Sequence, residues 1–369
     1  MTSAKTQTSP KTRSTDRVGS FRNIAVIRMS SVGDVIMALP ALEGLRETYP
    51  NARISWIVER RARNVLDGHP ALDEVIEFPR EVWRDIRRRR FGLLRCLPHA
   101  WRFYRGLRKR RFDLTIDFQG NLKSATCTIG CGAAVRLGYS KAECKEPNHY
   151  FTNRHLDLGG QHIHRMERDL LMVGEVGVPF QHRPPRIGYD ADDRRAGDAT
   201  IPFPDGEPPV VILHPGTSAW MPNKRWPLAS FASLGDTLAR EAQARVLLSW
   251  GPGERPLCDE IRELMEQPSE LLPDTPTIKS LGYLLSRADL VVGGDTGPLH
   301  LAYVQGVPTI GILGPSDPRF YYPLGHPERV FYRRMPCSPC RHRTCDQITC
   351  LTDISVTEVA NRALQILDS

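Results

Sequence analysis

The stretch VVGGDTGPLHLAYVQGVPTIGILGPSDP, residues 291–318, contains two apolar runs separated by a helical segment. The first run breaks into small and acidic residues, and the second ends in a Gly-Pro turn. Two buried strands joined by a helix pair in parallel, and ligands bind such sheets at the carboxyl ends of the strands. The glycine-rich turn is therefore a candidate binding site, of the kind that usually holds a phosphate.

The same alternation of strand and helix extends over the rest of the chain. Amphipathic helices are predicted between the apolar runs, for example over 226–242 and over 34–49, where Pro40 predicts a bend or a later helix start. A segment rich in Pro, Asp and Gly separates two sets of strands, so we predict two doubly wound α/β domains joined near residues 190–207. The predicted strands are 24–28, 54–58, 75–78, 114–118, 210–214, 245–250, 289–293 and 309–313.

Composition and missing motifs narrow the class of protein. A chain of 369 residues suits two domains, and 40% hydrophobic with 25% charged residues is typical of a globular protein. No apolar run is long enough to span a bilayer, and residues 1–20 lack the apolar core of a secretory signal. We therefore expect a disordered tail and a cytoplasmic protein. The sequence contains no GxGxxG, no P-loop and no HExxH motif. Their absence weakens the case for a dehydrogenase, a P-loop ATPase or a zinc protease of the common types.

The formal net charge of +8 comes from one segment, residues 80–111. It holds 13 Arg and Lys against Glu81 and Asp85, interleaved with Trp, Phe, Tyr and Leu, while the rest of the chain is slightly acidic. A solvated helix face is the plainest explanation. A membrane surface or an anionic lipid suits this pattern at least as well, and nucleic acid is the other candidate.

Four of the nine cysteines lie together in CSPCRHRTCDQITC, residues 337–350. Without a signal peptide, thiols are expected rather than disulfides. The number of cysteines is that of a closed structural zinc or iron site, although the spacing is irregular. The alternatives are such a metal site and a loop of reduced thiols. The four candidate ligands are Cys337, Cys340, Cys345 and Cys350.

Two polar loops that follow predicted strands have the composition of binding loops. In RMSSVGD, residues 28–34, three small residues let a ligand approach the backbone and Asp34 stands at a helix N-terminus. Such a carboxylate is most simply a helix cap, and its pKa would be lowered. At the start of the opening stretch, the backbone amides of Thr296 and Gly297 would point at an anion. The three small residues are Ser30, Ser31 and Gly33.

Two further loops lie in the second half of the chain. In HPGTSAWMPNKRWP, residues 214–227, Thr217 and Ser218 offer hydroxyls and Lys224 offers a cation, a combination suited to a diphosphate. In SWGPGERP, Glu254 follows two glycines and suits a ribose or a base.

The motifs SSVGDVIMALPAL, DLTIDFQGNLKSA, HPGTSAWMPNKRWP and GGDTGPLHLAYVQGVPTIGILGPSDP occur in this order. Together they resemble glycosyltransferase family 9, the ADP-heptose:lipopolysaccharide heptosyltransferases, from about Ile24 to the C-terminal helix. The segments DFQGNLKSA and KEPNHYFTNR look most like heptosyltransferase I, and the cysteine-rich tail looks more like heptosyltransferase II.

The resemblance implies a GT-B fold, with two Rossmann-like doubly wound domains facing a cleft. After the tail (1–20), residues 21–195 would bind the acceptor and residues 196–369 the nucleotide sugar. The implied reaction moves a heptose from ADP-heptose to the Kdo/heptose inner core of lipopolysaccharide, with inversion and without a cofactor or divalent metal for catalysis. The acceptor, Kdo-lipid A or a heptosyl core, is anionic and lipid-linked, so the protein would be peripheral on the cytoplasmic face of the inner membrane.

Site residues are carried over by motif. Asp34 matches the general base that deprotonates the acceptor hydroxyl for direct displacement, and Lys224 matches a lysine that neutralises the departing ADP. Asp295 is expected to contact a hydroxyl of the transferred sugar, and His300 to brace its loop. Lys123, with Ser30, Ser31 and Gly33, is assigned to the acceptor. The residues assigned to the donor are Thr217, Ser218, Glu254, Asp295, Thr296, Gly297 and His300.

Two other functions stay open. A member of the same family could use another nucleotide sugar or glycosylate a protein. A basic nucleic-acid-binding protein is supported by the charge alone and leaves the strand-end loops unexplained, so we expect no nucleic acid as a partner.

Overall fold

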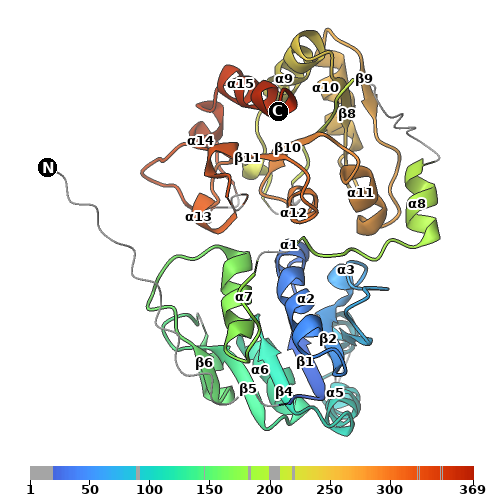
Figure 1. Ribbon diagram of the computed structural model, residues 1–369, viewed down its shortest axis with the longest axis vertical. Coiled ribbons are helices and arrows are strands. Elements are labelled where there is room, and N and C mark those ends of the chain that lie inside the picture. The colour runs from blue at the N-terminus through green and yellow to red at the C-terminus, as the bar shows by residue number, and fades with distance from the viewer. Residues whose placement is uncertain are drawn as a thin grey trace, which may run out of the picture.

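Two parallel β-sheets covered by helices build the molecule (Figure 1). The computed structural model describes residues 20–369 apart from 89–91, 145, 182–183, 199–207, 218–220, 322, 324, 341 and 343. The sheet of the first half lies below in this view, and the sheet of the second half lies above it. Within the described part of the chain, no helix combines the length and apolar character that crossing a membrane requires.

The N-terminal sheet has six parallel strands in the order β3-β2-β1-β4-β5-β6. The first four confirm the strands predicted there. The last two were not predicted, because the first half of β5 is only partly buried and β6 has three residues at the sheet edge, so neither forms a long apolar run. The strands are β1 (Asn23–Ile27), β2 (Arg53–Glu59), β3 (Glu74–Phe78), β4 (Leu114–Asp117), β5 (Val135–Tyr139) and β6 (Arg154–Leu156).

The C-terminal sheet repeats this plan in the order β12-β11-β10-β7-β8-β9, again with every pair parallel. The four predicted strands are confirmed, and the two missed ones, β9 and β12, are three-residue edge strands. The strands are β7 (Val210–His214), β8 (Arg245–Leu248), β9 (Ser269–Leu271), β10 (Leu290–Gly294), β11 (Thr309–Leu313) and β12 (Val330–Tyr332).

Both sheets share one strand order, with the first strand of each half beside its fourth. The direction of winding reverses between β1 and β4 and again between β7 and β10. Ligands of open α/β sheets bind at such reversals, beyond the carboxyl ends of the strands. The loop with Asp34 follows β1 and the loop with Asp295 follows β10, so each lies at a binding position of its own domain.

The predicted bend at Pro40 is confirmed. Instead of one helix over 34–49, α1 (Val32–Met37) and α2 (Leu39–Thr48) meet at Ala38. Pro40 lies in the first turn of α2, where a missing N–H group costs no helical hydrogen bond. The other helices of this half are α3 (Arg60–Arg63), α4 (Arg80–Arg87), α5 (Gly92–Lys109), α6 (Leu122–Cys131) and α7 (Arg165–Gly174).

The connection between the halves contains α8 (Ala191–Asp198), which packs on α11 (Ile278–Leu285) of the second half (Figure 1). Asp193 accepts a hydrogen bond from the Thr277 hydroxyl at 3.0 Å and pairs with Lys279 at 3.0 Å. The boundary predicted at 195/196 therefore falls inside this helix. The remaining helices are α9 (Leu228–Glu241), α10 (Arg255–Leu264), α12 (Gly297–Val304), α13 (Pro318–Tyr321), α14 (Thr349–Thr352) and α15 (Val356–Leu367).

The halves touch through α1 and α12, which face each other at the centre of Figure 1. Leu301 and Val304 of α12 belong to the same buried apolar cluster as Val35 and Ile36 of α1. Burial of these side chains holds together the two loops that carry the candidate residues.

Candidate active site

The loop after β1 is fixed by a side chain from the loop after β4. The side-chain oxygen of Gln119 accepts hydrogen bonds from the backbone N–H of Met29 at 3.0 Å and of Ser30 at 3.2 Å. Gln119 lies in the DFQG motif, which links that motif physically to the predicted acceptor residues. Both amides are satisfied by protein, and the Ser31 hydroxyl donates to Asp34.

Asp34 stands in the first turn of α1 and is paired with a buried arginine. It forms a capping box with Ser31, whose N–H and hydroxyl donate to it at 3.1 and 3.0 Å. Arg28 lies 2.9 Å from its other oxygen, and the Asp34 side chain is 24% exposed. Burial raises the pKa of Asp34, but Arg28, Arg165 and Ser31 outweigh that effect and hold the pKa below its ordinary value. Asp34 is therefore an ionised carboxylate with an open side.

Arg28 was not predicted from the sequence, although an arginine closing an apolar strand was a usable signal. It is almost completely buried, and its guanidinium donates to the Phe118 carbonyl as well as to Asp34. A second buried carboxylate, Asp169, accepts a hydrogen bond from the Tyr139 hydroxyl at 3.0 Å. Burial raises the pKa of Asp169, whereas the charge of Arg28 lowers it. The single positive charge of Arg28 therefore acts on two carboxylates, Asp34 and Asp169.

Lys123 lies in the first turn of α6 and is held by Glu59 at the end of β2. Glu59 pairs with Lys123 and, at 3.0 Å, with Arg80 of α4. The backbone N–H of Glu59 donates to the Met29 carbonyl at 3.0 Å. Lys123 is therefore joined to the β1 loop through Glu59.

In the second half, Asp295 is surrounded by three donors. Lys224 lies 2.7 Å from one of its oxygens and the His300 ring 3.0 Å from the other. The Ser316 hydroxyl, from the GPSDP motif, donates to the same carboxylate. Burial raises the pKa of Asp295, but His300 and Lys224 outweigh it and hold the pKa far below its usual range. The Asp295 side chain is only 8% exposed.

Thr217 and Glu254 lie around the loop after β7. The Thr217 hydroxyl is buried and has no hydrogen-bond partner among the residues that the structure describes, which is uncommon for a buried polar group and leaves it available to a ligand. Glu254 accepts from the Gly251 N–H at 2.9 Å and passes directly over Gly216, where a Cβ would lie 2.1 Å from its carboxylate. Ser218 lies outside the described residues.

The two loops meet across the interface of the halves. Thr296 caps α12, and Gly297 begins it opposite Val32 of α1. A Cβ on Gly33 would lie 2.8 Å from the His300 ring, so only glycine fits there without a shift. The small residues of the two motifs therefore permit this close approach.

A chain of side chains that the sequence did not reveal connects the two carboxylates. The ring of Tyr321 stacks on His300, with centroids 5.6 Å apart at 28°. Arg165, at the start of α7, lies 5.3 Å above the ring of Phe320, and its charge lowers the pKa of the neighbouring Tyr321 hydroxyl against the effect of burial. The charge of Arg165 also lowers the pKa of Asp34. Arg165 and Tyr321 come from segments without a glycine-rich signature, so no motif marked them.

The cysteine cluster lies beside the end of β11, where the backbone N–H of Cys340 donates to the Pro315 carbonyl at 3.0 Å, one residue before Ser316. All nine cysteines are free. Burial raises the pKa of the Cys350 thiol, and so do Cys340, Cys337 and Cys345, which shows that the four thiols are neighbours. In the part of the chain that the structure describes, no three ligating side chains gather closely enough to hold a metal ion. A structural zinc or iron ion here stays a prediction.

The arrangement suits the transfer of a group to an alcohol from a donor that carries an anionic leaving group. One half offers an ionised carboxylate with an open side, which can accept a proton. The other offers a lysine, an unpaired hydroxyl and a helix N-terminus, which can stabilise a diphosphate.

Comparisons with known proteins agree with this chemistry. Residues 100–350 match the model of glycosyltransferase family 9 (heptosyltransferase). Lipopolysaccharide heptosyltransferase 1 of Pseudomonas aeruginosa is 31% identical over 328 residues, which cover 87% of each chain. A family 9 glycosyl transferase from Veillonella parvula superposes with a TM-score of 0.74 at 20% identity, over 94% of this chain and 98% of that one. Escherichia coli heptosyltransferase WaaC with ADP-2-deoxy-2-fluoro heptose superposes with a TM-score of 0.70 at 23% identity, over 93% and 99%.

Proposed function

This chain belongs to glycosyltransferase family 9 and has the predicted GT-B fold, and from that premise we propose that it is an inverting heptosyltransferase. It moves a heptose from ADP-heptose to the Kdo/heptose inner core of lipopolysaccharide. The observation that carries this proposal is the meeting of the two loops that hold Asp34 and Asp295, each at the switch point of its own sheet, within a fold shared with heptosyltransferases.

Asp34 is proposed as the base. Its carboxylate takes the proton of the acceptor hydroxyl, that oxygen attacks the anomeric carbon, and the bond from this carbon to the β-phosphate oxygen breaks. Attack from the side opposite the leaving group inverts the anomeric centre. Arg28 and Arg165 keep Asp34 ionised before binding. The acceptor must remove water from the open side of Asp34 to make it basic enough.

Lys224 and the helix N-terminus at Gly297 neutralise the ADP that departs. The ion pair between Lys224 and Asp295 opens when the donor binds. Lys224 then contacts the diphosphate, and Asp295 accepts hydrogen bonds from hydroxyls of the heptose. The buried hydroxyl of Thr217 gains a phosphate oxygen as its missing partner, and Glu254 contacts the ribose.

On the acceptor side, Lys123 and the hydroxyls of Ser30 and Ser31 bind the anionic sugar. Glu59 holds Lys123 until a carboxylate or phosphate of the acceptor competes for it. Gly33 lets this loop come close to His300 of the donor half, so that the acceptor sugar and the donor sugar are held near each other.

The decisive experiment is a screen of nucleotide sugars against Kdo-lipid A and against its heptosylated form, with released nucleoside diphosphate as the readout. We expect ADP only with ADP-heptose, and the acceptor that reacts distinguishes a type I from a type II enzyme. Turnover with another nucleotide sugar, or with a protein in place of the lipid-linked acceptor, would assign the chain to a different member of the family.

A second experiment separates catalysis from metal binding. Because Lys224 and helix amides supply the positive charge, EDTA should leave the initial rate unchanged. Metal content measured on untreated protein then tests the cysteine cluster, with Cys337→Ser as the variant expected to lose any zinc or iron. A rate that needs added Mg²⁺ or Mn²⁺ contradicts the metal-free mechanism.

A further inference from the structure

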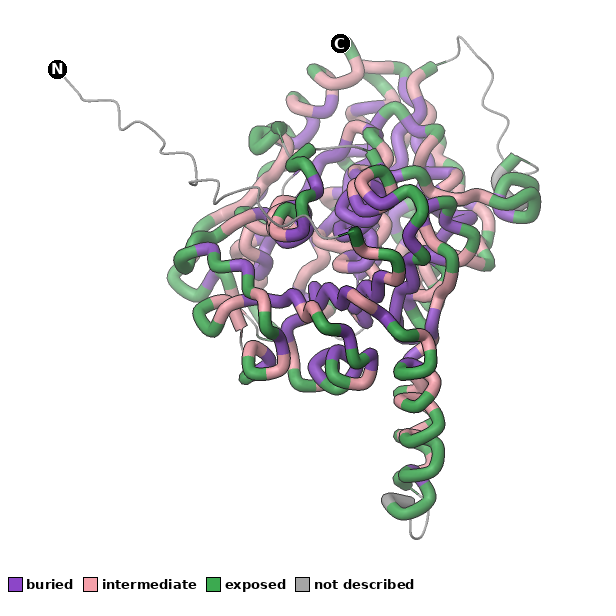
Figure 2. Tube along the Cα trace, turned by 60° about the horizontal axis from the view of Figure 1, so that its bottom comes forward, coloured by how far each residue is buried: buried purple, intermediate pink, exposed green. Residues whose placement is uncertain are grey.

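Two helices of the N-terminal half form an arm that stands out from the body of the molecule (Figure 2). The arm consists of α4 and α5, and its base is anchored by edge-to-face contacts. Phe78 of β3 contacts Trp83 and Phe103, with ring centroids 5.1 and 5.6 Å apart. These aromatic residues of the basic segment are therefore part of the core. The outer part of the arm is coloured as exposed in Figure 2.

The outer half of α5 presents large apolar side chains to solvent. Leu94 is 66%, Leu97 58% and Trp101 62% exposed. Their spacing of three and four residues places them on one face of the helix. We call Leu94, Leu97 and Trp101 the apolar stripe. Exposed apolar side chains that line up in this way mark an interaction site more often than chance placement does.

Arginines continue and flank this stripe. The guanidinium of Arg105 lies 4.7 Å above the ring of Trp101, and Arg108 follows one turn later on the same face. Arg95, Arg102, Arg105 and Arg108 form no ion pair within the part of the chain that the structure describes. Their charge is therefore available to an anionic partner.

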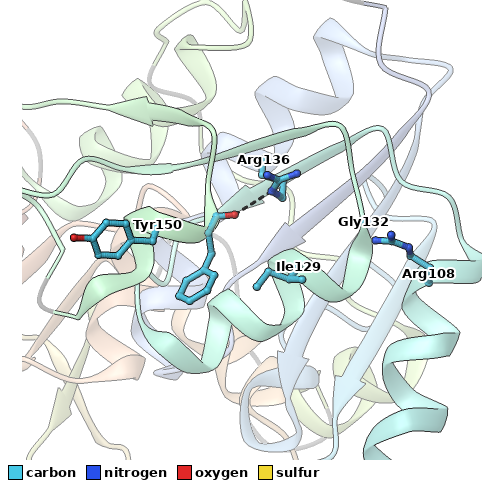
Figure 3. A pocket seen from close by; sticks show the side chains of 6 residues that line it. Arg108, Ile129, Gly132, Arg136 and Tyr150 are labelled. Carbon is cyan, nitrogen blue, oxygen red and sulfur yellow. Dashed lines mark hydrogen bonds between the residues drawn. The ribbon is translucent and has the colours of Figure 1, made fainter.

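A cavity of about 340 Å³ lies at the inner end of this face, where Arg108 and Arg136 line it together with Ile129 and Tyr150 (Figure 3). Arg136 is held by bonds from its guanidinium to the carbonyls of Phe151 at 3.0 Å and Ala133 at 3.0 Å. Both Ile129 and Tyr150 are largely exposed. The cavity combines two cations with an apolar rim, a composition suited to the headgroup of an anionic lipid.

We propose that the outer face of α5 docks the enzyme on a membrane surface that contains anionic lipid. The apolar stripe enters the boundary between headgroups and acyl chains, and the arginines and the cavity take lipid phosphates. A nucleic acid would use the arginines but would gain nothing from two leucines exposed in water. The inference rests on the proposed function only in that a lipid-linked acceptor lies at such a surface.

The test is flotation of the full-length protein with vesicles of phosphatidylethanolamine and phosphatidylglycerol, and with vesicles of phosphatidylcholine alone. We expect binding only to the anionic vesicles, weakened by salt. Leu97→Ser with Trp101→Ala should reduce partitioning by roughly tenfold or more. Arg105→Glu removes one cation and adds an anion, and should cost at least about fivefold. Leu264→Ser, at a leucine that is 49% exposed on the other half, is the matched control and should not change binding.

Two results would overturn the proposal: the stripe variants bind anionic vesicles as well as the wild type does, or the protein prefers duplex DNA to vesicles at equal ionic strength. A difference fluorescence spectrum between wild type and Trp101→Phe adds a local readout, with a blue shift of Trp101 on vesicle binding. Circular dichroism and unchanged transfer to a delipidated acceptor show that the variants are folded. Because flotation needs no substrate, its outcome is independent of whether the proposed transfer reaction is found.

Discussion

Each half of this molecule carries a candidate carboxylate at the switch point of its sheet, Asp34 after the first strand and Asp295 after the fourth, and the surroundings of the two carboxylates differ. Asp34 has one close cation, Arg28, and a side chain that is 24% exposed. Asp295 is enclosed by Lys224, His300 and Ser316, and its side chain is only 8% exposed. Both have a lowered pKa.

Their difference lies in what each can do with a proton. Each carboxylate has three close donors, but Asp295 is nearly enclosed beside the Lys224 ammonium, which leaves it little capacity for a proton, so it suits recognition and positioning. Asp34 is more exposed to solvent and can take a proton from a bound hydroxyl. Two domains with the same strand order therefore hold carboxylates for two different tasks.

The strongest test of this comparison replaces each carboxylate by its amide. Asp34→Asn should lower kcat by roughly a thousandfold, because general base catalysis contributes effects of this size, while ADP affinity stays nearly unchanged. Asp295→Asn should mainly raise KM for the nucleotide sugar. Stopped assays of ADP release and calorimetric titration with ADP separate the two effects. Full activity in Asp34→Asn would remove it as the base.

The second test concerns Lys224, which forms an ion pair with Asp295 when no donor is bound. Lys224→Ala should lower kcat by roughly a hundredfold, since one group that stabilises developing charge in the transition state has an effect of this size. Lys141→Ala, at an exposed lysine of the other half, serves as the control. Unchanged kinetics in Lys224→Ala would mean that the ion pair is structural and does not open for the diphosphate.

The third test concerns the contact between the two loops. A methyl group on Gly33 would lie 2.8 Å from the His300 ring, whereas a methyl group on Gly297 would lie 3.6 Å from Val32, an ordinary contact. Gly33→Ala should therefore lower kcat/KM by roughly tenfold to a hundredfold by displacing the loops, and Gly297→Ala much less. Equal effects of the two substitutions would show that the close approach does not matter to transfer.

The sequence predicts those strands and site residues that lie in apolar runs or in motifs, and it misses the others. Eight strands were predicted because they form apolar runs. Three of the four missed strands are three-residue edge strands such as β9, and the fourth, β5, is only partly buried over its first half. The candidate residues of the motifs follow predicted strands in the sequence. Their position at the ends of strands could therefore be predicted from the order of strands and helices. Arg28 closes an apolar run and could have been noticed. Arg165 at the start of α7 reaches the aromatic residues of α13 only in the folded chain, and no local pattern contains that contact.

The smallest expected effect tests the side chain that connects the two carboxylates. Arg165 lowers the pKa of Asp34, so Asp34 stays ionised to a lower pH than an ordinary aspartate does. Arg165→Gln should raise this pKa and move the acid limb of kcat/KM to higher pH. A lowered pKa also stabilises the fold above the unfolded value, and this contribution is lost as the pH falls through the folded one. The variant should therefore lose some of its stability at neutral pH.

A pH profile of kcat/KM and chemical denaturation at pH 4 and pH 7 measure both consequences. Arg61→Gln, at an exposed arginine of the same half, is the control and should leave the profile unchanged. An acid limb that does not move in Arg165→Gln would mean that Arg28 alone sets the ionisation of Asp34. In that case the connection through Tyr321 and His300 joins the two halves without tuning the base, and the two carboxylates act independently.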